Sequence, residues 1–406
     1  MAAMINLIEF QMSLLLFIAL AGYLLASRVN QSAVIGEILV GLIVGPSVLG
    51  LITYTSFVSS IAHLGAVVLL FVVGLEFRIK DIAKPKYFMI ALLGVIFPWA
   101  AGYFTSMLFG FPFASAVFIG TALTATSIAI TANVLKEMGK LQTEAARAII
   151  GAAVIDDVLG LLALAIGNGL VSGTISAAYL GLVFVKAVLF LVGGALLGHF
   201  GFRRLVILID GTSFAKKYPE VTFIFAMMFA FLYGMAAELI GLSAIVGAFI
   251  AGASLGSLRL RNSKDLKAGS DFLQIIFASI FFVSLGILAD VRALDVRVLL
   301  FLVVLTAVAV VSKLIGCGGV ALAWRSGLKE SLIIGVGMSP RGEVAMIVAL
   351  IGLNQGLIKQ DIYVSIILMS LVTTIVTPII LRNWLYREGG KKRQVGRPAV
   401  ARRQAR

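Results

Sequence analysis

The chain has 406 residues, of which 61% are hydrophobic and only 13% are charged. Soluble proteins are roughly half apolar and about a quarter charged, so this composition excludes a water-soluble enzyme and indicates a membrane domain with many spans. The net charge of +14 is explained by its distribution among loops, as described below, and does not indicate a nucleic-acid partner. The single cysteine, Cys317, cannot form a disulfide within the chain.

Apolar runs long enough to cross a bilayer follow one another along nearly the whole chain. A helical span needs about 20 predominantly apolar residues. The first run is about as long as a full span and many more follow it, so we expect a span rather than a cleaved signal segment. Charges, glycines and turn clusters divide the chain into thirteen predicted spans: 5–26, 34–50, 57–77, 86–109, 112–134, 144–168, 177–203, 219–239, 243–257, 272–288, 297–324, 330–354 and 362–385.

Basic residues alternate between the two sides of this predicted arrangement. Of the 33 Lys and Arg residues, 27 follow odd-numbered spans, three follow even-numbered spans and three lie within spans. Lys and Arg concentrate in cytoplasmic loops, so we expect the N-terminus outside and the C-terminus in the cytoplasm. The basic tail is expected to be solvated and to contact anionic lipid.

Short similarities recur at a nearly constant offset. Residues 35–50 resemble 245–256, residues 71–75 resemble 282–286 and residues 119–124 resemble 334–339, at offsets of 210, 211 and 215 residues. These pairs relate spans 2–6 to spans 9–13. A shift of seven spans inverts the second copy, and inverted repeats are typical of secondary transporters. Chance similarity among Gly-, Ala- and Val-rich helices is the alternative.

Two adjacent aspartates, Asp156 and Asp157, lie in the middle of the sixth predicted span. An ionisable side chain within lipid is costly and is by default a functional candidate. Neighbours on a helix point about 100° apart, so these two can share one cavity and still meet different partners. A bare carboxylate accepts either a proton or a hard alkali cation, but not both. The pair therefore predicts a proton-coupled cation site.

A lysine in the middle of a span and two spans with interruptions are further candidates for the cation site. Lys313 is expected to pair with a carboxylate, although the sequence does not choose which one. Span 5 contains Thr126 and Ser127, which offer oxygen ligands or bond their own backbone. Span 12 contains the run 335–343, rich in glycine and including Pro340. Discontinuous helices expose half-helix ends and free carbonyls that coordinate ions.

Further charged residues are expected to have structural roles. Arg341 and Glu343 should hold the crossing of the interrupted helices together, with Glu76 as a partner for Arg341. The two histidines, His63 and His199, are expected to pack or to lie at an interface rather than to sense pH.

The Asp156–Asp157 pair, Lys313, the break at 125–127 and the run 337–343 together resemble the monovalent cation:proton antiporter-2 family, in particular its bacterial NapA-type Na⁺/H⁺ antiporters. The similarity covers essentially the whole chain. It implies an all-α polytopic membrane protein with 13 transmembrane helices and two inverted five-helix repeats with crossed discontinuous helices. The implied domains are a scaffold for dimerisation (1–85 and 219–290), a core for ion translocation (86–168 and 297–385), a linker helix (177–203) and a cytoplasmic tail (386–406).

The same resemblance implies roles for the site residues. Asp157 would bind Na⁺ and carry a proton, with Asp156 beside it, and Asp156 would pair with Lys313, which can also lose its proton. The implied protein is an electrogenic homodimer in the plasma membrane of a prokaryote, serving pH homeostasis. It would exchange cytoplasmic Na⁺ or Li⁺ for external H⁺ by an elevator movement of the core. We expect no enzymatic activity, no cofactor and no nucleic-acid partner.

Three other functions are considered. A K⁺/H⁺ antiporter of the same fold is the nearest alternative, because no residue in the sequence separates the alkali cations. An intramembrane aspartyl protease needs two carboxylates facing each other across a cleft, usually from two helices, whereas these two are adjacent on one helix. A passive channel needs a continuous pore with weak multi-site binding, and the titratable cluster gives no reason for one.

Overall fold

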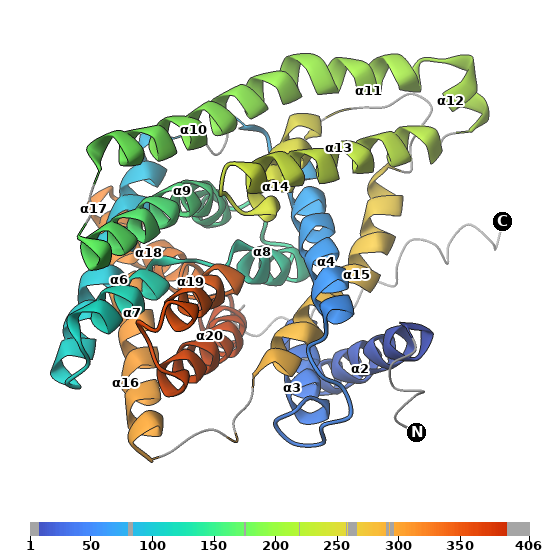
Figure 1. Ribbon diagram of the computed structural model, residues 1–406. Coiled ribbons are helices and arrows are strands. Elements are labelled where there is room, and N and C mark those ends of the chain that lie inside the picture. Colours follow the sequence, from blue (N-terminus) through green and yellow to red (C-terminus); the bar gives the residue numbers. More distant parts are fainter. Residues whose placement is uncertain are drawn as a thin grey trace.

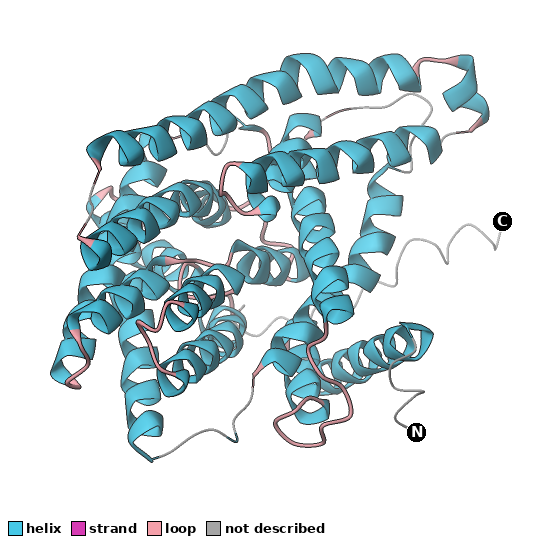
Figure 2. Ribbon diagram, viewed as in Figure 1, coloured by secondary structure: helices cyan, strands magenta, loops and turns pink. Residues whose placement is uncertain are grey.

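The computed structural model describes residues 8–79, 84–173, 176–218, 220–256, 258, 266–289, 292 and 296–387. Within these residues every regular element is a helix (Figure 2). Most of the basic tail predicted at 386–406 lies outside the described residues. The all-α expectation is therefore confirmed for the described part of the chain.

The helices follow one another with short connections (Figure 1). In chain order they are α2 (Ile8–Arg28), α3 (Ala33–Val44), α4 (Ser56–Leu75), α6 (Pro85–Leu108), α7 (Phe113–Thr124), α8 (Ile128–Glu137), α9 (Glu144–Ser172), α10 (Ala177–Leu196), α11 (Arg203–Asp210), α12 (Ser213–Lys217), α13 (Glu220–Leu239), α14 (Ala244–Leu255), α15 (Leu266–Leu288), α16 (Val296–Lys313), α17 (Gly319–Ala323), α18 (Leu328–Gly337), α19 (Glu343–Asn354) and α20 (Gln360–Ile380).

Ten helical segments among the described residues are long and apolar enough to cross a membrane. Three shorter apolar helices, 33–44, 244–255 and 344–354, fall at positions where the sequence also predicts spans. Each predicted span contains a helix, while the count of thirteen crossings stays a prediction. The seventh segment is longer than predicted, because a π-helical stretch at Leu197–Phe202 joins α10 to α11 and Arg203 does not end the helix.

Glycines allow the central helices to approach until their backbones touch. A Cβ on Gly252 of α14 would overlap the carbonyl oxygen of Phe71 in α4, and one on Gly286 of α15 would overlap that of Ile38 in α3. Small residues are the usual means of close packing in membranes, where lipid gives helices no hydrophobic reason to associate. This packing joins α3, α4, α14 and α15 into one group (Figure 1).

Two segments are interrupted where the sequence predicts discontinuous helices. The first break separates α7 from α8 at residues 125–127, and the second separates α18 from α19 at residues 338–342. The two breaks meet, because the Ser127 N–H donates to the carbonyl oxygen of Pro340 at 2.8 Å. Thr131 Oγ1 also donates to the carbonyl oxygen of Gly337 at 2.6 Å. Backbone groups freed by one break are thus partly bonded by the other, as an apolar surrounding requires.

Arg341 stabilises the second break, but not through the predicted ion pair. Its side chain is fully buried, and its guanidinium donates to the carbonyl oxygens of Met338 (3.2 Å), Ser339 (3.1 Å) and Ala309 (3.2 Å). Among the described residues Arg341 makes no ion pair with Glu76, so the prediction of that pair is wrong. Glu76 is instead the C-terminal cap of α4.

Arg341 bonds to backbone carbonyls because the interrupted helix leaves them without partners. The last carbonyls of a helix have no partner within it, and a guanidinium has five donors with which to satisfy them. Glu343 begins α19, and its side chain lies outside the described residues, so its predicted role at the crossing stays a prediction.

We predict that Gly252→Ala destabilises the protein, because the added methyl group must push the backbone of α4 away. Overpacking of this kind costs about 1–3 kcal/mol. The melting temperature in detergent, followed by intrinsic fluorescence, should therefore fall. Gly193→Ala is the matched control, since a Cβ on Gly193 in α10 meets nothing within 4 Å. Equal melting temperatures for the two variants would contradict this packing.

Candidate functional site

The two aspartates lie near the middle of α9, whose first turn is capped by the Thr143 hydroxyl. The helix is continuous through them, so their side chains point in different directions, as the helical geometry predicts. Asp156 is only 2% exposed and faces the protein interior, whereas Asp157 is partly exposed at a cavity. The helix thus gives two adjacent carboxylates different surroundings.

Lys313 meets Asp156 in the interior. Its ammonium nitrogen lies 3.3 Å from Asp156 Oδ1 and also donates to the carbonyl oxygen of Thr124 at 3.0 Å. Thr124 is the last residue of α7, so Lys313 satisfies a carbonyl at the first break and places a positive charge at a helix C-terminus, where it is favoured. Both charged side chains are buried, and such a pair persists only with good geometry and further hydrogen bonds.

Lys313 is also the last residue of α16, and the chain continues in a π-helical stretch at Leu314–Gly318. Short π-helical turns within longer helices are frequent at functional sites. The side chain of Lys313 is 0% exposed, so its ammonium does not extend to the surface of the protein.

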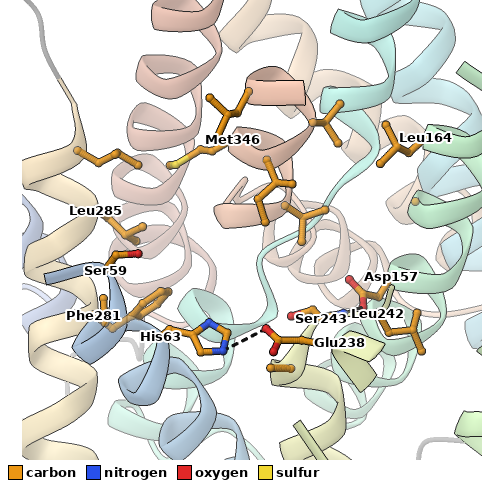
Figure 3. Close-up of a pocket in the computed structure, with 18 of the residues that line it drawn as sticks. Ser59, His63, Asp157, Leu164, Glu238, Leu242, Ser243, Phe281, Leu285 and Met346 are labelled. Carbon is orange, nitrogen blue, oxygen red and sulfur yellow. Dashed lines mark hydrogen bonds and ion pairs between the residues drawn. The ribbon is translucent and has the colours of Figure 1, made fainter. Parts of the chain in front are cut away.

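Asp157 borders a cavity of about 650 Å³, which is large enough to hold many waters. Helices α4, α9, α13, α15, α19 and α20 all contribute to its wall. Figure 3 shows Asp157 at one side of this cavity, with Ser243 and Leu242 next to it and Phe281 and Leu285 at the opposite side. A carboxylate on an open cavity can exchange ions with water, which the buried Asp156 cannot do directly.

A second, smaller void of about 20 Å³ also borders Asp157. It is lined by Thr126 and Ser127 at the first break and by Gly342 at the second. A volume of this size holds about one water. The structure therefore brings three of the predicted ligands, Asp157, Thr126 and Ser127, around one small space, while Asp156 does not line it.

Two residues on the cavity wall were not among the predicted site residues. His63 Nε2 in α4 lies 3.2 Å from Glu238 Oε1 in α13 (Figure 3), and both side chains are about half exposed. The available sequence signal was one histidine and one glutamate, each within a mostly apolar span. Because they lie 175 positions apart, nothing local indicated that they meet.

A third such residue is Ser243, which acts through its backbone. Its N–H donates to Asp157 Oδ2 at 2.9 Å. A backbone donor has no signature in side-chain composition, so sequence patterns could not have found it.

Comparison with known proteins gives a consistent result. The profile described as "Sodium/hydrogen exchanger, transmembrane" matches residues 14–387. GerN of Bacillus cereus, described as a Na⁺/H⁺-K⁺ antiporter, is 32% identical over 375 residues, covering 92% of this chain and 95% of that protein. NhaS3 of Synechocystis, described as a high-affinity Na⁺/H⁺ antiporter, is 33% identical and covers 90% and 87% respectively.

A solved structure has the same fold. The sodium proton antiporter MjNhaP1 of Methanocaldococcus jannaschii superimposes with a TM-score of 0.71 at 19% identity, covering 92% of this chain and 94% of that one. From the profile match and these full-length relatives, we conclude that the chain belongs to the family of transmembrane sodium/hydrogen exchangers.

Proposed function

We propose that this protein exchanges cytoplasmic Na⁺, or Li⁺, for external H⁺ at Asp157. The observation that carries the proposal is that this carboxylate lines both the 650 Å³ cavity and a small void that Thr126 and Ser127 also line. The relatives GerN and NhaS3, both named as Na⁺/H⁺ antiporters, support the choice of cargo.

Exchange follows from the chemistry of one carboxylate. A cation in the small void would be coordinated by Asp157 and by the hydroxyls of Thr126 and Ser127. A proton on Asp157 removes the negative charge that holds the cation, so the two cargoes exclude each other. The same site can then carry Na⁺ in one direction and H⁺ in the other, provided that it opens to one side of the membrane at a time.

The pair of Lys313 and Asp156 supplies a second proton in this proposal. If cation binding draws Asp156 away from Lys313, the buried ammonium loses its partner. It would then release its proton to the side of the membrane from which the cation entered. Two protons would then move for each Na⁺, and one net charge would cross the membrane. The membrane potential would drive Na⁺ export with about 2.3 kcal/mol per 100 mV.

The proposed movement is that of a core against a scaffold. The core comprises residues 86–168 and 297–385 and the scaffold 1–85 and 219–290, joined by the long peripheral helix that begins at residue 177 and is seen along one side of Figure 1. The 650 Å³ cavity lies between helices of these two groups, which supports an elevator mechanism.

Polar contacts join the two groups elsewhere along this boundary. The Lys136 ammonium in α8 lies 2.6 Å from Asp271 Oδ1 in α15, and Ser32 Oγ donates to Glu137 Oε2 at 2.6 Å. The charge pattern assigns these ends of the helices to the cytoplasmic side, so we infer that the boundary is closed there, that the cavity opens to the outside and that this is the outward-facing state.

Thirteen crossings and two inverted five-helix repeats complete the proposed architecture. Their support is the pairing of the α7–α8 break with the α18–α19 break, at corresponding positions of the two halves. The proposal includes a homodimer formed by the scaffold, in a prokaryotic plasma membrane with the N-terminus outside, serving pH homeostasis.

The second candidate is K⁺/H⁺ exchange by the same residues, which the printed name of GerN favours. Proton flux in liposomes, measured with a pH-sensitive dye after addition of Na⁺, Li⁺ or K⁺, separates the two. We expect responses to Na⁺ and Li⁺. A response to K⁺ alone would refute Na⁺ as the cargo, and no response to any cation would refute the proposed function.

We predict that Asp157→Asn abolishes exchange, because the neutral amide neither holds a cation nor carries a proton. Na⁺-dependent proton flux should fall to that of protein-free liposomes, while the elution volume in detergent stays that of the parent. Asp361→Asn is the matched control, since Asp361 lies in the first turn of α20 and does not line the cavity. If the Asp157 variant still exchanges Na⁺ for H⁺, the cargo binds at other residues and the proposed site is wrong.

We predict that Lys313→Ala removes the voltage dependence of exchange, because the second proton then has no carrier. The measurement is the stoichiometry of H⁺ to Na⁺ in liposomes clamped at defined potentials. Lys186→Ala is the control, because Lys186 is a second lysine within a span but lies exposed on α10. Voltage dependence that persists in the Lys313 variant would contradict the role of this lysine as a proton carrier.

A further inference from the structure

The hydrogen bond between Ser243 and Asp157 connects two parts of the molecule that must separate during transport. Ser243 precedes α14, within the proposed scaffold, and Asp157 lies in α9, within the proposed core. The donor is the backbone N–H, 2.9 Å from Asp157 Oδ2. If the core moves relative to the scaffold, this bond has to break in every transport cycle.

The turn before α14 holds this amide firmly in place. Ser243 is the N-terminal cap of α14, and its own hydroxyl accepts from the N–H of Ile245 at 3.2 Å. Leu242 is only 3% exposed and packs with Val158, the residue that follows Asp157. The N–H is therefore aimed at Asp157 by local packing and not by chance contact of a loose loop.

The strength of this bond depends on what else the carboxylate binds. A hydrogen bond to a bare carboxylate is charge-assisted and roughly twice as strong as one between neutral groups. A cation in the small void would lie beside Asp157 and compensate its charge. The restraint on the core is then strongest when the site is empty and weaker when the site is loaded.

We propose that the Ser243 amide is a positioning group that restrains the core while Asp157 is empty and releases it once Asp157 holds its cargo. This inference rests on the proposed exchange function and adds to it a reason for tight coupling. An antiporter must not return empty, because an empty return turns exchange into a leak. The Ser243 amide would suppress that step through its hydrogen bond to Asp157.

Two substitutions at the same position separate the amide from the hydroxyl. Ser243→Pro removes both the N–H and the hydroxyl, and the φ of −65° at this residue is one that proline adopts. Ser243→Ala removes only the hydroxyl and is the matched control, because it keeps the N–H and the packing of Leu242 with Val158 that aims it at Asp157. Should the proline variant fail to elute as the parent does, serine is replaced by its α-hydroxy analogue, which puts an ester in place of the N–H without a ring.

The readout is the efflux of ²²Na⁺ from liposomes at the same high pH on both sides, with and without external Na⁺. External Na⁺ gives the core a return cargo, so it should accelerate efflux through the parent and through Ser243→Ala. For Ser243→Pro we expect efflux without external Na⁺ to rise about tenfold, the factor that corresponds to roughly 1.4 kcal/mol. A loss of folded transporter would lower this efflux, and the elution volume checks that the variant keeps the fold of the parent.

The outcomes separate this inference from the proposed function. If the proline and ester variants keep the parental acceleration by external Na⁺, the amide does not restrain the empty core and the inference is wrong. If the parent itself shows neither this acceleration nor Na⁺-dependent proton flux, the proposed function is wrong.

Discussion

The structure at the centre of this protein depends on one requirement: the backbone groups that an interrupted helix leaves free must find hydrogen-bond partners within the protein. Two helices are interrupted where they cross. The hydrocarbon of a membrane offers no hydrogen-bond partners to the backbone groups that these interruptions leave free. The chain satisfies part of this need by bonding the breaks to each other, through Ser127 and Pro340, and part through cationic side chains. Arg341 satisfies carbonyls at the second break, and Lys313 satisfies one at the first.

Lys313 thereby links structure to chemistry. The same ammonium that closes the end of α7 also compensates Asp156, so neither buried charge stands alone. A change at Asp156 must therefore affect the crossing, and a change at the crossing must affect the charge balance around Asp156. Asp157 is free of this constraint, because it faces the cavity and receives its hydrogen bond from a different helix, through the turn at Ser243.

Exchange by the proposed movement would need a group of helices that stays together and a boundary along which it can move. The close-packed glycines provide the first, and the cavity lies at the second. Helices α3, α4, α14 and α15 touch backbone to backbone and form one closely packed group. The cavity lies where this group faces α9, α19 and α20, and the ion pair of Lys136 with Asp271 joins α8 to α15. A boundary that contains a cavity and breakable polar contacts suits the proposed movement of one group against the other.

The sequence by itself determined the features that depend on neighbouring residues. Apolar runs located the helices, the residues around Pro340 and Thr126 located the breaks, and helical geometry placed Asp156 and Asp157 in different directions. Only the tertiary structure decided which distant groups meet. Packing brought Lys313 to Asp156, bonded Arg341 to backbone carbonyls instead of Glu76, paired His63 with Glu238 and aimed the Ser243 amide at Asp157. Periodicity and composition report the faces of a single helix, whereas partners many residues apart are selected by how several helices pack together.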